Sequence, residues 1–157
     1  MRTHYITDQE IIKKTILDCD VCFVGMTDKN NQPYVIPMNF GYVDGCFYLH
    51  SAPEGHHISC LEKNNKVCIT LCSDRQLAWQ NQEIACSYTM KSKSIVALCE
   101  ISFIEEYNKK IEILNTLMSH YSGEAFNYST PSVNNVKIWQ ADIQQITCKE
   151  FGVPYRK

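Results

Sequence analysis

QPYVIPMNFGYVDGCFYLHSAPEGHH, residues 32–57, is the stretch that decides the predicted fold. Two apolar runs, 34–42 and 46–50, flank the dipeptide Asp44-Gly45. A type I′ turn requires positive φ at both central residues, and Asp-Gly adopts this conformation at low cost. The stretch therefore predicts an antiparallel β-hairpin joined by a two-residue turn.

The open end of this hairpin carries polar side chains from both strands. One strand has Asn39 and Phe40 near its end, and the other ends in His50 and Ser51. Because the hairpin is short, we expect these groups to share one rim. This rim is therefore the first candidate for a functional site.

A short helix is predicted over residues 55–64, directly after the hairpin. The first amides of a helix lack intrahelical partners, and the helix dipole favours negative charge there. The residues that flank this start, or reach it from a neighbouring strand, are His50, Ser51, His56, His57, Lys91, Lys93 and Ser94. The local residues support a phosphate site and a solvated helix cap with surface lysines equally well.

Length and charge restrict the class of protein. The chain has 157 residues, which indicates one domain over 1–157, and its net charge is −2. No basic excess is present, so we expect neither nucleic acid nor a membrane as a partner. No apolar run approaches the roughly 20 residues of a membrane span, and no secretory signal is evident, so the predicted location is the cytoplasm.

Nine cysteines are many for a chain of this length. An odd number in strand-like segments argues against a secreted disulfide scaffold. We expect most to be reduced core residues, because free cysteine packs as a small hydrophobe. The cysteines in such segments are Cys22, Cys46, Cys68, Cys72, Cys86 and Cys99.

Two possible metal or redox motifs lack the context that they require. Cys19 and Cys22 form a CxxC, but no second zinc-ligand pair follows and the motif does not open a helix. His56, His57 and Cys60 could be ligands, but neighbouring residues on a helix point in diverging directions. No metal site is therefore predicted.

The remaining pattern predicts a mainly β protein with flanking helices. We expect the two tryptophans, Trp79 and Trp139, to be packing residues. Strands joined by hairpins with helices between them favour an antiparallel sheet or barrel. The predicted strands are 21–27, 34–42, 46–50, 66–72, 85–104 and 136–147, and the predicted helices are 7–18 (with a Thr7 capping box), 55–64 and 106–120.

Four stretches also resemble a known family. They are PYVIPMNFGYVDGCFYLHSAPEGHHI (33–58), KVCITLC (66–72), CSYTMKSKSIVALCEISFIEE (86–106) and IWQADIQQITCKEFG (138–152). In this order they resemble the pyridoxamine 5′-phosphate oxidase-like FMN-binding split barrels, and most closely the branch that includes the nitroimidazole-resistance proteins. The resemblance covers about residues 5 to 152.

The resemblance implies a six-stranded antiparallel split barrel that forms a homodimer, with FMN in clefts between the protomers. It implies that Pro37, Met38 and Asn39 meet the flavin ring, and that His50 and Ser51 face the flavin. Gly55 and His57 would help to hold the phosphate, with Lys93 and Ser94 from the adjoining strand. His50 is also the candidate catalytic residue, orienting a substrate or donating a proton.

This sequence departs from the family pattern at the phosphate end. His57 stands where the family usually has Lys or Arg, and Lys93 stands where it has Arg. Histidine carries only part of a positive charge near neutral pH, and lysine lacks the bidentate fork of arginine. Ser92 replaces the usual aromatic residue before Lys93.

Three functions follow from the resemblance. The first is an FMN-dependent oxidoreductase with a small planar substrate over the flavin. The second is reduction of nitroimidazole antibiotics, and the third is a flavin or haem carrier or sensor without turnover. Oxidation of pyridoxamine phosphate is less favoured, because it needs an Arg-rich second phosphate site and the chain has only Arg2, Arg75 and Arg156.

Overall fold

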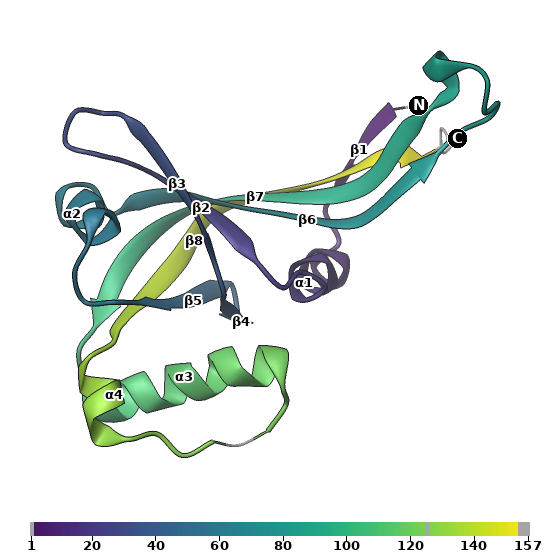
Figure 1. The fold of residues 1–157 in the computed structure, drawn as a ribbon. Coiled ribbons are helices and arrows are strands. Elements are labelled where there is room, and N and C mark those ends of the chain that lie inside the picture. The colour runs from purple at the N-terminus through teal and green to yellow at the C-terminus, as the bar shows by residue number, and fades with distance from the viewer. Residues whose placement is uncertain (1, 125, 154–157) are drawn as a thin grey trace.

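A computed structural model describes residues 2–124 and 126–153 and shows an antiparallel sheet with flanking helices (Figure 1). Strands make up 47% and helices 27%, so the predicted mainly β class is confirmed. The strands are β1 (Arg2–Ile6), β2 (Cys22–Thr27), β3 (Pro33–Met38), β4 (Gly41–Val43), β5 (Cys46–Ser51), β6 (Lys66–Ala78), β7 (Thr89–Ile104) and β8 (Lys137–Val153). The helices are α1 (Gln9–Leu17), α2 (His56–Lys63), α3 (Tyr107–Tyr121) and α4 (Thr130–Asn134), with a 3₁₀ turn at Ala85–Ser87.

The strand order explains how the sheet curls toward a barrel. Neighbouring strands follow the order β3-β2-β6-β7-β8-β5-β4, and β1 pairs with β8. The described chain has eight strands rather than six, because β1 is additional and the predicted strand 34–42 is divided into β3 and β4. β3 and β4 lie at opposite ends of the order, yet only Asn39 and Phe40 separate them in sequence.

This two-residue connection corrects the prediction of one strand over 34–42. β3 pairs with β2, whereas β4 pairs with β5, so the chain changes partner between Met38 and Gly41. Pro37 has no amide hydrogen to donate, and this is tolerated because β3 is an edge strand. The side chain of Phe40 is fully buried at the crossing.

The predicted turn is confirmed. Asp44 has φ 48° and Gly45 has φ 81°, as a type I′ hairpin requires. In the β4–β5 pair Gly41 lies opposite Tyr48. Extending this register by two residues brings Asn39 to the level of His50, so the expected rim forms.

Two strands, β6 and β8, extend further than the sequence indicated, whereas β7 begins four residues later than predicted, after a 3₁₀ turn at Ala85–Ser87. β6 continues to Ala78, beyond the predicted end at residue 72, and β8 runs to Val153, beyond the predicted end at residue 147. Together with β7 they cross the barrel and extend beyond it as an arm whose tip lies far from α3 (Figure 1). The polar residues of 74–83 concealed this extension, because few apolar side chains alternate there.

The helix starts also differ in detail. The N-cap of α1 is Asp8, not Thr7, and its carboxylate accepts hydrogen bonds from the amides of Glu10 and Ile11. Gly55 is the N-cap of α2 and provides no side-chain cap. No helix within 2–124 and 126–153 has the length and apolar character needed to cross a membrane.

The core lies inside the curled sheet. Trp139, Phe40, Phe47 and Leu49 are among its fully buried side chains. Trp139 is therefore the packing residue that was predicted, but Trp79 is not, because 45% of its surface is exposed.

All nine cysteines are free. Cys22, Cys46 and Cys99 are buried, as expected, and Cys68 is half-buried, but Cys72 and Cys86 are exposed. Burial raises the pKa of Cys22 to about 12, which makes this thiol unreactive near neutral pH.

We expect Gly41→Ala to destabilise the fold, because β4 and α3 approach too closely there for a side chain. A Cβ on Gly41 would lie 3.1 Å from the backbone nitrogen of Leu117. Overpacking against backbone should lower the free energy of unfolding by about 1–3 kcal/mol, measured by urea denaturation. Gly25→Ala is the control, since its nearest contact is 3.4 Å. An equal loss in both variants would contradict the prediction.

Candidate functional site

The rim of the hairpin forms a pocket with α3. Asn39 and His50 line a pocket of about 270 Å³ together with Leu117, Met118 and Tyr121. The sequence predicted that the first two would meet, and the structure confirms that they do. The α3 residues were missed as site residues, although Leu117 and Tyr121 share one helix face by their four-residue spacing.

The environment of His50 keeps its ring neutral. The side chain is exposed at the mouth of the pocket, yet the protein atoms around it lower its pKa below the ordinary value of 6.5. The cause is desolvation, which disfavours the charged form. Near neutral pH a neutral imidazole can donate one hydrogen bond and accept another.

Tyr121 holds the wall of this pocket in place. Its hydroxyl donates to the carbonyl oxygen of Asp20 at 2.9 Å and accepts from the amide of Phe40 at 2.9 Å. One residue earlier, Nε2 of His120 lies 2.9 Å from the carbonyl oxygen of Cys19. The end of α3 therefore binds the β3–β4 crossing to the start of β2.

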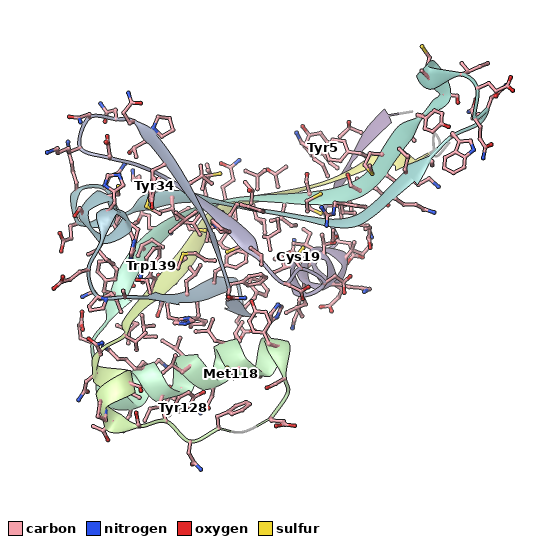
Figure 2. All side chains as sticks on the ribbon, viewed as in Figure 1. Tyr5, Cys19, Tyr34, Met118, Tyr128 and Trp139 are labelled. Carbon is pink, nitrogen blue, oxygen red and sulfur yellow. The ribbon has the colours of Figure 1, made fainter. Side chains whose placement is uncertain are left out.

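A second group of predicted residues surrounds Trp139, which lies between α2 and β5 in the view of Figure 2. The indole Nε1 donates to Oγ of Ser51 at 3.1 Å, and this hydroxyl donates to the carbonyl oxygen of Ala52 at 2.7 Å. The ring of His57 stacks on Trp139 with a centroid separation of 5.6 Å. Ser51 thus orients Trp139.

His57 is tucked beneath Gly55 at the start of α2. Gly55 has φ 136°, and a Cβ at this position would lie 2.8 Å from Cε1 of His57. Nε2 of His57 is buried and has no hydrogen-bond partner. A buried nitrogen without a partner costs free energy, so its presence beside an uncapped helix start suits an anionic ligand.

The neighbouring His56 is placed differently. Its ring is exposed and packs edge-on against Tyr34 at 4.7 Å between centroids. Only one histidine of the pair therefore faces the Gly55 turn.

Lys93 and Ser94 lie apart from these groups within one chain. Nζ of Lys93 is 2.8 Å from Oδ2 of Asp74 near the root of the arm. The Ile104 end of β7 is level with His50, since both pair with Ile138. At about 3.3 Å per residue, the eleven positions from 93 to 104 correspond to roughly 35 Å along β7.

The remaining predicted residues line the approach to the crossing. Pro37 and Met38 end β3 next to Asn39, and Pro37 is paired with Phe23. A pocket of about 600 Å³ lies on the outer face of β2, β3, β6 and β7, and none of the predicted site residues lines it. We place the candidate site at two groups of predicted residues, Asn39 with His50 and Gly55 with His57, because these groups offer polar atoms to a ligand.

Comparison with known proteins identifies the family to which this fold belongs. The family described as pyridoxamine 5′-phosphate oxidase matches residues 8–150. A Bacteroides thetaiotaomicron protein, provisionally described as a 5-nitroimidazole antibiotic resistance protein, is 44% identical, with a TM-score of 0.87 over 95% of this chain and 87% of that one. No curated protein matches.

More distant structures share the fold. A Mycobacterium smegmatis protein described as binding FAD and heme has a TM-score of 0.81 at 13% identity, over 98% of this chain and 76% of that one. The flavocytochrome Anf3 of Azotobacter vinelandii has a TM-score of 0.79 at 19% identity, over 99% of this chain and 72% of that one. The fold is thus shared with proteins described as flavin- and heme-binding.

We expect the pKa of His50, measured by an NMR titration of the ring protons, to lie below 6.5. Because this pKa is lowered on folding, the unfolded chain binds more protons as the pH falls through 6.5, and His50 then destabilises the fold. The ring-proton resonance that disappears in His50→Gln is that of His50. The same variant should flatten the fall in the free energy of unfolding that occurs as the pH drops through 6.5. A His50 pKa at or above 6.5 would contradict the desolvated environment.

Proposed function

Because this chain belongs to the pyridoxamine 5′-phosphate oxidase family, we propose that it binds FMN and acts as an oxidoreductase on a small planar substrate. One observation carries the proposal: the unpartnered Nε2 of His57 lies at an uncapped helix start, close along the chain to the Asn39–His50 pocket. The His57 nitrogen and the helix start suit a phosphate. The Asn39–His50 pocket suits the edge of a planar ring.

The phosphate end uses α2. Gly55 provides no side chain to cap the helix, so the amides of the first turn are available to anionic oxygens. Nε2 of His57 would donate one further hydrogen bond, with the ring held against Trp139. Ser51 supports this arrangement indirectly, because its hydroxyl binds the indole of Trp139.

The ring end uses the β3–β4 crossing. The backbone of Pro37 and Met38 and the amide of Asn39 would hydrogen-bond the flavin ring, and Leu117 and Met118 would exclude water from the pocket. FMN supplies the electron transfer when it is bound. His50, held neutral, orients a substrate or donates a proton to it.

A homodimer would complete this site. Lys93 lies roughly 35 Å along β7 from the level of His50, so Lys93 and Ser94 would not reach the site of their own chain. In a dimer with FMN between protomers, Lys93 and Ser94 of a second copy would approach the flavin. Lys93 would then exchange its contact with Asp74 for the cofactor.

Nitroimidazole reduction is the second candidate activity. It is favoured by the 44% identical Bacteroides protein, whose description names 5-nitroimidazole resistance. Flavin or haem binding without turnover is the third, because structural relatives are described as binding FAD or heme.

The absorbance spectrum of the purified protein separates these proposals. Bands of oxidised flavin support FMN binding, and a Soret band supports haem instead. The released cofactor can be identified as FMN or FAD by chromatography. A colourless protein that gains no flavin on titration would refute the proposal, and flavin binding without reduction of any acceptor would favour the carrier.

We expect His57→Phe to weaken FMN binding, because phenylalanine keeps the stacking on Trp139 but removes the nitrogen. The loss of one hydrogen bond to a charged group predicts a dissociation constant raised about 10-fold, or about 1.4 kcal/mol. Titration by quenching of flavin fluorescence measures it. His56→Phe is the matched control and should bind FMN as the unaltered chain does. If both variants bind equally well, His57 does not hold the phosphate.

A further inference from the structure

A pocket of about 510 Å³ lies at the root of the arm, and none of the residues assigned to FMN lines it. β2 pairs with β6 only as far as Phe23, which lies opposite Thr70. Extending this register by two residues places Cys72 opposite Val21, two positions along the chain from Cys19. Both cysteines line the pocket. The fold therefore brings to one opening two thiols that are far apart in the sequence.

The two thiols differ in their access to solvent. Cys72 is exposed, whereas Cys19, beside α1 in Figure 2, is only 6% exposed. The Cys19 thiol donates to the carbonyl oxygen of Thr15 at 3.4 Å. Burial raises the pKa of Cys19 to about 11, the neighbouring Cys72 thiol raises it further, and a hydrogen bond from the Cys72 backbone lowers it. A reagent from solvent therefore meets Cys72 first, with Cys19 beside it.

Cys22, the other cysteine of the CxxC motif, does not share this opening. Its side chain is fully buried in the core, and it is not part of the pocket wall. The sequence motif pairs Cys19 with Cys22, but the structure gives Cys19 a different accessible neighbour. That neighbour is Cys72.

The wall of the pocket is acidic. Three carboxylates, of Asp18, Asp20 and Asp74, line it against the single guanidinium of Arg75. Asp18 and Asp74 each bind a lysine, at 2.7 and 2.8 Å. No ion pair involves Asp20 within residues 2–124 and 126–153. A wall of this composition attracts an ammonium group and repels a carboxylate.

Two uncharged side chains of the same wall also suit an ammonium group. Ser73 is 6% exposed, and its Oγ has no hydrogen-bond partner in the described part of the chain. A buried hydroxyl without a partner costs free energy, and an ammonium donates hydrogen bonds that would satisfy it. The ring of Phe23 is 49% exposed and offers a face to a cation.

We propose that Cys72 and Cys19 form a thiol–disulfide exchange site for a small disulfide that carries an ammonium group. First, the Cys72 thiolate attacks one sulfur of the ligand, whose disulfide bond breaks, and the released thiolate takes a proton from water. Cys19 then loses its proton to water and attacks the Cys72 sulfur, which releases the second thiol. The two protein thiols are oxidised to one disulfide, and the ligand disulfide is reduced to two thiols.

The roles of the two cysteines follow from their surroundings. Cys72 attacks because it is exposed. Cys19 resolves the mixed disulfide, because its raised pKa keeps the thiol protonated until the mixed disulfide lies beside it. Neither cysteine is assigned to FMN, so the exchange stands or fails separately from flavin binding.

Peptide mapping after oxidation tests the pairing. Cystamine, a disulfide with two ammonium groups, is the probe, and Cys86→Ser removes the other exposed thiol from every sample. We expect mass spectrometry without reduction to show a Cys19–Cys72 linkage. Cys19→Ser should stop at the mixed disulfide on Cys72, and Cys72→Ser should give neither product. Cys22→Ala is the matched control, because it removes the CxxC motif and should leave the linkage intact.

The ligand charge is tested by comparison with dithiodipropionate, a disulfide with two carboxylates. Each rate constant is divided by that of 2-mercaptoethanol with the same disulfide, which removes the difference in intrinsic reactivity. We expect a preference for cystamine of roughly 10-fold or more at low ionic strength, falling as salt is added. Asp20→Asn should reduce this preference.

Circular dichroism verifies that each variant is folded, and the mapping of Cys86→Ser alone decides the pairing if another variant is not. Three outcomes would overturn the proposal. They are a mixed disulfide on Cys72 that persists without linkage to Cys19, a linkage of Cys19 to Cys22, and equal normalised rates for the two disulfides.

Discussion

The hydroxyl of Tyr121 is the contact on which this structure depends most. It accepts the amide of Phe40 and donates to the carbonyl oxygen of Asp20, each at 2.9 Å. These two backbone groups belong to the crossing between β3 and β4 and to the approach to β2, where no strand pairing can satisfy them. A buried amide without a partner is costly, so one α3 side chain stabilises the point at which the sheet curls.

The same constraint shapes the candidate site. The crossing holds Asn39 at the level of His50, and the end of α3 closes the pocket above both. On the other side of β5, Trp139 orients His57 and is itself oriented by Ser51. Helix α3 thus positions the Asn39–His50 part of the candidate site, and the buried indole of Trp139 positions the His57 part. Neither part depends on a single loop.

Much of the fold was predictable because it follows local chemistry. Asp44-Gly45 determined the turn, and the rim of Asn39 and His50 followed from the hairpin. The N-cap was misplaced by one residue, because Thr7 and Asp8 both have a side chain able to cap a helix. The arm was missed, since its apolar face is interrupted by polar residues and is not buried in the chain's own core.

The sequence by itself determined the mainly β class, the hairpin and the residue types of the candidate site, because turn geometry and side-chain chemistry act over a few positions. Only the tertiary structure decided which candidates meet. It brought His57 under Gly55 and against Trp139, and it separated Lys93 by the length of β7. The physical reason is that distances across a sheet depend on strand pairing, which joins residues far apart in the chain and leaves no local pattern to read.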